Sequence, residues 1–156
     1  MLALTASADI ESRERVCKLL HMENATRIIV SPNRTNIRLG LVSPPTQEEK
    51  LKCLDWIVES VRTKTTAMAP IIIYCRSKPL VGKVFCYLKA ELAEDAWVDR
   101  DPEHKPSTQL IGIYHSDTLP HNKKRVFSSL NGEGNCRVVV ATTALGMGLN
   151  FPNIFM

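Results

Sequence analysis

Three short runs of aliphatic residues alternate with amphipathic segments in the second half of this 156-residue chain. The runs lie at residues 71–75, 110–114 and 138–140, and the last consists of three consecutive valines. β-Branched side chains suit a strand that is buried on both faces, and helical segments between such strands are typical of parallel crossover connections. The alternation predicts an α/β fold in which helices flank a mostly parallel sheet.

Capping residues and helical periodicity predict the helices. Asp9 and Ser77 each precede a segment with apolar residues on one face, and Thr46 and Glu49 form a capping box. A further helix is expected to stop at Gly132, because glycine favours helix termination. The predicted helices span residues 9–20, 46–61, 77–92 and 120–130.

The first 42 residues contain further apolar runs, and we expect strands at residues 2–5, 27–30 and 37–42. Residues 95–108 are polar and contain proline, so they are expected to form a surface loop. Trp56 lies near an apolar stripe and is predicted to be in the core, whereas Trp97 is predicted to pack against that loop. Stacking of either indole on nucleic-acid bases is the alternative interpretation.

The composition limits the class of protein. A net charge of +4 and a pI near 8.9 permit a polyanionic partner without requiring one. The five cysteines form no C-x-x-C pair, which favours reduced thiols over a disulfide framework or a zinc site, and Cys75 and Cys136 are expected to be buried. No apolar stretch approaches the roughly 20 residues that cross a bilayer, and no signal-peptide layout is present. We expect a soluble intracellular protein, nuclear or cytoplasmic, with no membrane partner.

A polar cluster follows each of the three strong strand predictions. The clusters are Arg76-Ser77, His115-Ser116-Asp117 and Thr142-Thr143. Because the carboxyl ends of parallel strands meet at one edge of a sheet, we expect these groups to lie together and to hold phosphates. The alternatives are ordinary strand-to-helix turns, a packed His115 and an Arg76 that only pairs with a helix. Residues 123–125 are expected to be a solvated basic face, and contact with phosphate is the alternative interpretation.

Five segments of the chain, taken together, resemble the RecQ branch of superfamily 2 helicases. They are, in order, residues 2–8 (helicase motif III), residues 33–38 (the linker between two RecA-like lobes), residues 72–77 (motif IV), residues 114–116 (the Tyr-His-Ala step) and residues 141–153 (motif V). The match follows the family's order and spans nearly the whole chain apart from an insertion near Asp95. Motif V is the specific part of the resemblance.

The resemblance implies a RecA-like parallel sheet flanked by helices, as in the P-loop NTPase-type second helicase lobe. Residues 1–33 would be the end of the first lobe with its linker, and residues 34–156 the second lobe without its last strand and motif VI. The sequence has no phosphate loop, no Asp-Glu-x-His motif and no arginine-finger segment, all of which phosphoryl transfer needs. The intact family enzyme uses ATP and Mg²⁺. We expect this chain alone neither to hydrolyse ATP nor to bind it strongly, and to need the missing first lobe as a partner.

The resemblance also implies roles for single residues. Contacts with nucleic acid would come from the strand ends, contacts with the nucleotide from motif V, and coupling between the lobes from motif III. The nucleic-acid-binding set is Arg76, Ser77, His115, Thr142, Thr143 and Gly146. The nucleotide-facing pair is Gly148 and Asn150, the coupling pair is Thr5 and Ser7, and no catalytic or metal-ligating residue is assigned.

The leading hypothesis is a fragment of a 3′–5′ ATP-dependent DNA helicase that acts on single-stranded or partly duplex DNA in repair and recombination. The alternative is a non-catalytic nucleic-acid-binding or scaffold module derived from a helicase lobe. A small-molecule-binding Rossmann-like domain is a weaker alternative, because the first βα turn carries no G-x-G-x-x-G.

Overall fold

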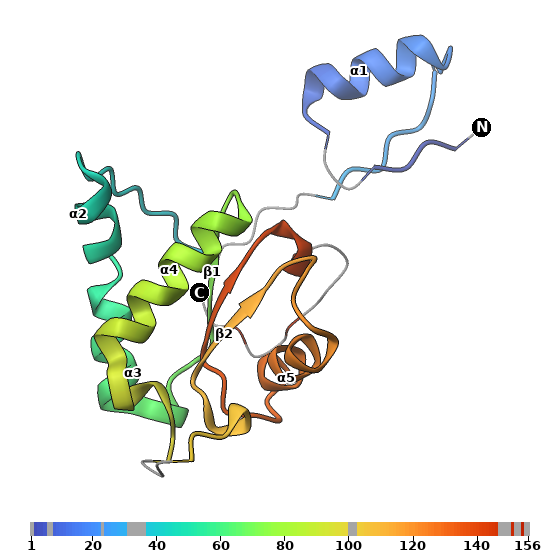
Figure 1. Cartoon of the computed structure of the whole chain (residues 1–156). Helices are drawn as coiled ribbons and strands as arrows, with labels where there is room; N and C mark the ends of the chain where they lie inside the picture. Colours follow the sequence, from blue (N-terminus) through green and yellow to red (C-terminus); the bar gives the residue numbers. More distant parts are fainter. Residues whose placement is uncertain are drawn as a thin grey trace. The chain divides into compact units, whose positions relative to one another are not determined.

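The computed structural model describes residues 2–5, 8–22, 24–30, 37–99, 103–146, 151 and 154, without the side chains of residues 47 and 48. The chain divides into two compact units, Met1–Leu39 and Gly40–Met156 (Figure 1). The larger unit contains the sheet and most of the helices. Residues 31–36, which include the start of the predicted linker, lie outside the described residues.

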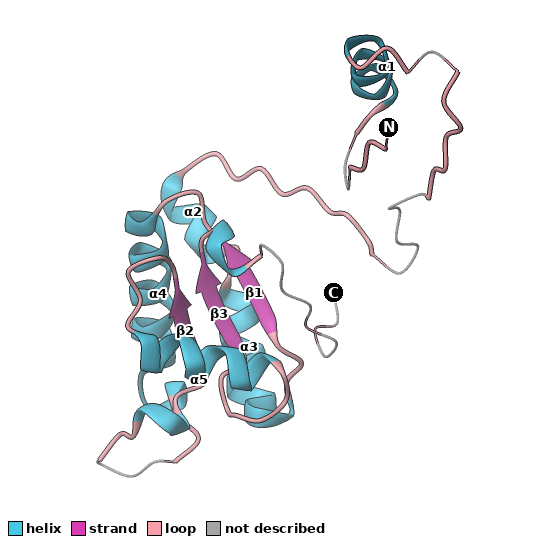
Figure 2. Cartoon of the chain, turned by 90° about the vertical axis from the view of Figure 1, so that its right-hand side faces the viewer, coloured by secondary structure: helices cyan, strands magenta, loops and turns pink. Residues whose placement is uncertain are grey.

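The larger unit is built on a three-stranded parallel sheet (Figure 2). Its strands are β1 (Ile71–Tyr74), β2 (Ile111–Tyr114) and β3 (Val138–Ala141), in the order β1-β3-β2. β3 pairs with both neighbours, so that Val138 lies opposite Ile71 on one side and Ile111 on the other. The predicted α/β fold with a parallel sheet is confirmed, and the valine run forms the central strand as expected for a segment buried on both faces.

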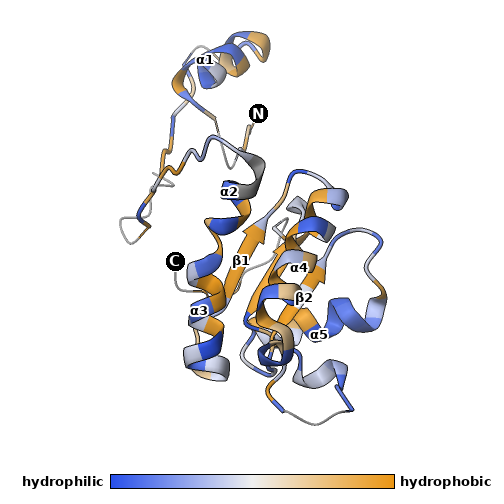
Figure 3. Ribbon diagram, turned by 60° about the vertical axis from the view of Figure 1, so that its left-hand side comes forward, coloured by the Kyte–Doolittle hydropathy of each residue, from blue (hydrophilic) through white to orange (hydrophobic). Residues whose placement is uncertain are grey.

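Helices cover both faces of this sheet (Figure 3). Because side chains alternate along a strand, β3 contributes to two separate apolar clusters. Val138 and Val140 pack with residues of α3 (Asp55–Lys64) and α4 (Lys78–Leu92). Val139 and Ala141 pack on the opposite face with residues of α5 (Pro120–Leu130). All four residues of β3 are fully buried, so the sheet is rigidly held at its centre.

The helices begin at the predicted caps. Ser77 Oγ accepts a hydrogen bond from the Leu80 amide at the start of α4, and Asp9 Oδ1 accepts from the Ser12 amide at the start of α1 (Ile10–Leu19). Thr46 and Glu49 form the predicted capping box of α2 (Gln47–Lys52). These side chains satisfy amides that have no partner within the helix.

The segment after Thr46 differs from the prediction. One helix was expected over residues 46–61, but the chain turns at residues 53–54 and forms α2 and α3 separately. The prediction that Trp56 lies in the core is wrong, since Trp56 is 59% exposed. Ile57, Val58 and Val61 form the buried face of α3. Trp56 projects about 100° away from Ile57 around the helix, and therefore toward solvent.

Arg125 corrects another prediction. It is half-buried instead of being part of a solvated face, and its guanidinium donates to the carbonyls of Gln109 (3.0 Å) and Ile111 (3.3 Å). β2 is an edge strand among the described strands, so these contacts cover carbonyls that no strand pairs. Gly112 permits the close packing of α5 here, because a Cβ would lie 2.9 Å from Val126 Cγ2 and 3.0 Å from Cys136 Sγ.

The polar segment between α4 and β2 contains the 3-10 turns η2 (Ala93–Ala96) and η3 (Pro106–Thr108). Trp97 packs within this segment as predicted, because its ring stacks on His104 with centroids 4.0 Å apart and 13° between the planes. An isolated bridge between Trp97 and Gln109 closes the loop just before β2.

The smaller unit contains α1 as predicted but no strand among its described residues. The predicted strands at residues 2–5 and 27–30, and the one at residues 37–42 that crosses the unit boundary, are therefore wrong. Leu4 and Ile28 are 85% and 91% exposed. A strand needs a partner for its backbone N–H and C=O groups, and no described segment pairs with these runs.

The state of the cysteines matches the prediction from the sequence. All five thiols are free, and Cys75 and Cys136 are buried as predicted. Within the described ranges there is no cluster of three or more His, Cys, Asp or Glu side chains that could hold a metal ion. None of the described helices is long and apolar enough to cross a membrane.

Candidate nucleic-acid interface

The carboxyl ends of the three strands lie side by side at one edge of the sheet. The Cys75 amide donates to the Ala141 carbonyl (2.7 Å), and the Thr142 amide donates to the Tyr114 carbonyl (3.1 Å). These backbone hydrogen bonds continue the sheet by one residue beyond β1 and β3. The structure therefore brings the three predicted polar clusters together, and we call residues 76–78, 115–118 and 142–146 the carboxyl edge.

Arg76 and Ser77 lie at the junction of β1 and α4. Ser77 is exposed, and because its Oγ accepts from the Leu80 amide (3.4 Å), its hydroxyl proton stays available to an acceptor. Arg76 is exposed, and among the described residues its guanidinium has no hydrogen bond or ion pair. The alternative that Arg76 only forms an ion pair with a helix is therefore not supported by the described residues.

His115 lies in a tight turn that follows β2. The Thr118 amide donates to the His115 carbonyl (3.1 Å), and the His115 amide donates to Thr118 Oγ1 (3.0 Å). The Asp117 amide donates to His115 Nδ1 (3.2 Å), so a neutral imidazole carries its proton on Nε2 and can donate it. His115 is partly exposed and lines a cleft of about 370 Å³ together with Asp117 and Asn122.

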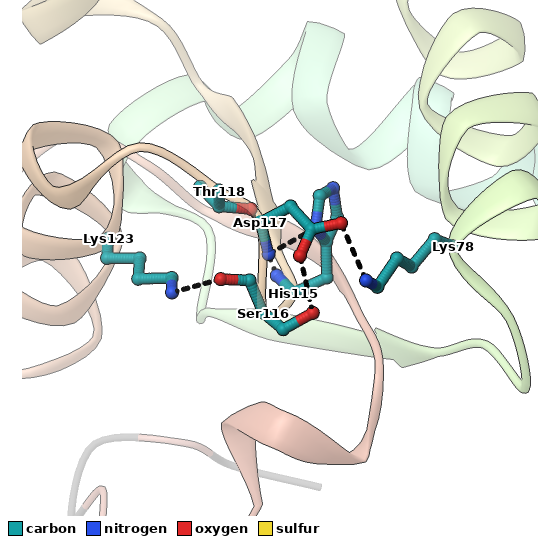
Figure 4. Close-up of polar contacts among 6 residues, drawn as sticks. All are labelled: Lys78, His115, Ser116, Asp117, Thr118 and Lys123. Atoms are coloured by element: carbon teal, nitrogen blue, oxygen red, sulfur yellow. Dashed lines mark hydrogen bonds and ion pairs between the residues drawn. The ribbon is translucent and has the colours of Figure 1, made fainter.

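Two lysines converge on this turn (Figure 4). Lys78 Nζ, from the first turn of α4, lies 2.6 Å from Asp117 Oδ2. Ser116 Oγ donates to Asp117 Oδ1 (2.9 Å), and Lys123 Nζ, from α5, donates to the Ser116 carbonyl (2.7 Å). The hydrogen bond from Lys78, followed by that from Ser116, holds the pKa of Asp117 below its ordinary value, so Asp117 is ionised at neutral pH.

Neither Lys78 nor Asp117 was assigned an individual role from the sequence, although Asp117 was among the polar residues expected at this edge. Lys78 directly follows the predicted cap Ser77, and Asp117 belongs to the polar cluster after β2. The signal that could have indicated a role for them was their position just after two predicted strands. Their pairing depends on the order β1-β3-β2, which places the two loops on either side of the central strand.

Thr142, Thr143 and Gly146 lie after β3. Thr142 is half-buried, and Thr143 begins the 3-10 turn η4 (Thr143–Leu145), in which the Gly146 amide donates to the Thr143 carbonyl (3.0 Å). A Cβ at Gly146 would lie 3.3 Å from Tyr74 Oη, so the glycine lets this turn pack against the end of β1. Thr143 and Gly146 are exposed, which leaves a hydroxyl and open backbone at the carboxyl edge.

The remaining predicted residues are Gly148, Asn150, Thr5 and Ser7. Gly148, Asn150 and Ser7 lie outside the described residues. Thr5 is exposed and belongs to the smaller unit. The predicted nucleotide-facing and coupling roles therefore stay predictions.

The described part of the carboxyl edge suits a phosphodiester backbone better than a nucleotide with its magnesium. Asp117 is the only carboxylate in residues 76–78, 115–118 and 142–146, and it already pairs with Lys78. Mg²⁺ is commonly held by one or two carboxylates together with phosphates, so these residues do not fit a Mg–ATP site. Arg76, Lys78 and Lys123, with the hydroxyls of Ser77, Thr142 and Thr143, instead offer donors to phosphate oxygens.

Comparison with known proteins identifies the family of the larger unit. A family model described as "Helicase conserved C-terminal domain" matches residues 49–156. This region contains all three strands and the whole carboxyl edge.

Similar relatives extend along almost the whole chain. An ATP-dependent DNA helicase RecQ from Haemophilus influenzae is 29% identical over 99% of this chain, which covers 21% of that relative. A probable ATP-dependent DNA helicase RecS from Bacillus subtilis is 27% identical over 99% of the chain, covering 27% of the relative. A RecQ-like DNA helicase BLM from Xenopus laevis is 25% identical over 99% of the chain, covering 10% of the relative.

The chain thus spans less than a third of the length of these curated relatives. The resemblance to the RecQ branch that the motifs indicated is confirmed, and so is the RecA-like parallel sheet. The family match over more than half of the residues, together with the relatives along nearly all of them, shows that this RecQ-like chain belongs to the helicase conserved C-terminal domain family.

Proposed function

We propose that the larger unit binds the sugar-phosphate backbone of single-stranded DNA along its carboxyl edge. The observation that carries this proposal is the convergence of Arg76, His115 and Thr143 at the ends of three parallel strands. Phosphate contacts of this kind give affinity without reading sequence, and they weaken as salt is added.

The nucleic-acid set of the proposal is Arg76, Ser77, His115, Thr142, Thr143 and Gly146. Arg76 provides an exposed guanidinium, without a partner among the described residues, for bidentate contact with phosphate oxygens. The Nε2 proton of His115 and the hydroxyls of Ser77 and Thr143 add neutral donors along the same edge. The edge therefore combines one strong charged contact with several weaker hydrogen bonds.

The family and the relatives support a wider proposal. We infer that the chain is the second RecA-like lobe, residues 34–156, of a 3′–5′ DNA helicase that uses ATP and Mg²⁺, with residues 1–33 as the end of the first lobe. In that enzyme Gly148 and Asn150 would face the nucleotide, and Thr5 and Ser7 would couple the lobes. Action on single-stranded or partly duplex DNA and a nuclear or cytoplasmic location belong to the same proposal.

Binding of a fluorescein-labelled oligothymidylate, followed by fluorescence anisotropy in a salt series, tests the site. The wild-type chain is expected to bind, and log K is expected to fall linearly with log salt concentration. Arg76→Ala should weaken binding and make this slope shallower by about 0.7, the value for one phosphate contact on a single strand. Thr142→Ala should weaken binding with little change in slope, because it removes a neutral donor.

Lys64→Ala is the matched control, because it removes one exposed positive charge at the end of α3, before β1 begins. It should leave affinity and slope close to wild type. Binding that does not depend on salt, no binding by the folded chain, or equal losses for Arg76→Ala and Lys64→Ala would overturn the proposal.

A further inference from the structure

The ion pair between Lys78 and Asp117 joins two of the three strand ends. Lys78 follows β1 at the start of α4, and Asp117 follows β2, yet their charged atoms are 2.6 Å apart (Figure 4). This is the short distance of a charge-assisted hydrogen bond. The pair lies within the carboxyl edge, beside Arg76 and Ser77.

The Asp117 carboxylate is held in place by its own turn. The Asp117 amide is bound to His115 Nδ1, and Ser116 Oγ donates to the second carboxylate oxygen. The turn is closed by the reciprocal hydrogen bonds between His115 and Thr118. The backbone of this turn therefore positions the Asp117 carboxylate to face Lys78.

The pair itself is open to solvent. The side chains of Lys78 and Asp117 are 49% and 66% exposed. Exposed ion pairs are weak, because water screens both charges and two flexible side chains must be ordered. A phosphate that approaches the edge can therefore replace the carboxylate on Lys78 at little cost.

We propose that Asp117 occupies Lys78 in the free protein as a stand-in for a backbone phosphate, so that an incoming strand must displace the carboxylate to gain the Lys78 contact. The inference rests on the proposed single-strand binding and assigns Asp117 as the residue that limits its strength. Asp117 is also the only negative side chain on this edge, so it repels the strand it competes with.

The experiment compares Asp117→Asn with wild type in the oligothymidylate assay, using the whole 156-residue chain. The amide keeps the shape and the hydrogen bond from Ser116 but loses the charge. We expect binding to become about two- to five-fold tighter, the range that an exposed ion pair allows. The salt slope should become steeper by up to about 0.7, because Lys78 then neutralises a phosphate without competition.

Asp99→Asn is the matched control for net charge. Asp99 is exposed and lies two residues after Trp97. Trp97 bridges Gln109, which lies just before β2 begins, whereas the carboxyl edge lies where β2 ends. Asp99 is therefore remote from the carboxyl edge. Its substitution should leave affinity and slope unchanged. An equal gain in Asp99→Asn and Asp117→Asn would reduce the effect to overall charge and overturn the inference.

A double variant tests whether the effect passes through Lys78. In the Lys78→Gln background, Asp117→Asn should give a clearly smaller gain than it gives in wild type. An undiminished gain would show simple repulsion by Asp117, and no gain or a loss in Asp117→Asn alone would show that Asp117 does not compete. Either result overturns the inference.

The two proposals fail in different ways. If wild type binds the strand with a salt-dependent affinity that Arg76→Ala weakens, but Asp117→Asn does not tighten it, only the inference about Asp117 fails. If the folded wild type and all variants fail to bind, single-strand binding itself fails and the inference fails with it. Circular dichroism of each variant confirms that the fold is retained.

Discussion

The two units of the chain contain similar apolar runs but bury them to different extents. In the larger unit, every residue of β3 is fully buried between helices on both faces. In the smaller unit, α1 has no buried residue, and Ile28 to Val30 form no strand and are exposed. The difference shows that an aliphatic run becomes a strand only where a neighbouring strand pairs its backbone.

The helices of the two units differ in the same way. α4 begins at a serine cap and then packs Val81, Val84 and Leu88 into the core, so tertiary contacts add to its local stability. α1 also begins at a capping side chain, but none of its residues is buried, and an exposed Glu11–Arg15 pair lies along it. Isolated helices of this length are marginal in water, so α1 depends on its cap far more than α4 does.

The largest expected contrast is between two thiols. Cys17, in α1, is partly exposed, whereas Cys136 is buried before β3. Cys17 should react with a maleimide in the native state, and Cys136 only when the larger unit unfolds. With an ordinary domain stability, the Cys136 rate should be lower by about a thousand-fold or more. Mass spectrometry of peptides after timed labelling measures both rates, and equal rates would contradict the contrast.

Cys136 also makes a prediction about pH. Burial raises the pKa of its thiol from an ordinary 9.0 to about 11. Because the pKa of the folded state is the higher one, the stabilising contribution is complete below pH 9 and is lost as the pH rises toward about 11. Thermal unfolding should therefore occur at lower temperature across this window. Cys136→Ala is the control in which this part of the pH dependence is absent.

A second contrast concerns the free energy of unfolding. Leu88 is fully buried in α4, so Leu88→Ala should destabilise the larger unit by about 2–5 kcal/mol. Ile28 is 91% exposed, so Ile28→Ala should change stability by less than about 0.5 kcal/mol. Urea unfolding followed by circular dichroism measures both. A loss for Ile28→Ala comparable to that of Leu88→Ala would mean that Ile28 is packed in the folded chain.

The smallest contrast concerns the two caps. Ser77→Ala should lower the stability of the larger unit by about 1 kcal/mol, with α4 still formed because packing retains it. Asp9→Ala should instead reduce the population of α1 itself, as read from Cα chemical shifts of residues 10–19. Loss of the helical shifts of α4 in Ser77→Ala, or unchanged shifts of α1 in Asp9→Ala, would contradict the expected difference between the two caps.

The Asp9 cap also responds to pH. Hydrogen bonds from Ser12 hold the pKa of Asp9 below its ordinary value of 3.8. Since the folded pKa is depressed, the cap is complete above that value and is lost as the pH falls through the lower, folded pKa. The helical shifts of α1 should decrease in this acidic range in wild type and stay flat in Asp9→Ala.

Local chemistry predicted much of the larger unit. The runs at residues 71–75, 110–114 and 138–140 form the three strands, Ser77 caps the helix that follows β1, and Thr46 caps α2. The meeting of three polar clusters at one edge also followed from the parallel alternation of strands and helices. Motif resemblance predicted the family, which the comparisons confirm.

Most of the errors share a physical origin. The runs at residues 2–5 and 27–30 have strand-like composition but pair with no segment that the structure describes, and Trp56 lies off the buried face of α3. Arg125 was expected in solvent, but the edge of β2 supplies carbonyls that its guanidinium can reach. The errors on the strands and on Arg125 concern contacts between segments distant in the chain, which composition and periodicity do not encode. The error on Trp56 is local, because Trp56 lies outside the buried face of α3.

The sequence by itself determined the strand–helix alternation, the caps and the chemical character of the carboxyl edge, because these depend on residues that are neighbours in the chain. Only the tertiary structure decided that Lys78 meets Asp117 and that Lys123 reaches the Ser116 carbonyl. The Lys78–Asp117 contact follows from the strand order β1-β3-β2, which brings together residues that lie 39 positions apart in sequence. Lys123 reaches Ser116 within the connection between β2 and α5. The edge therefore presents a lysine already paired with a carboxylate, a pairing that the residue types alone did not indicate.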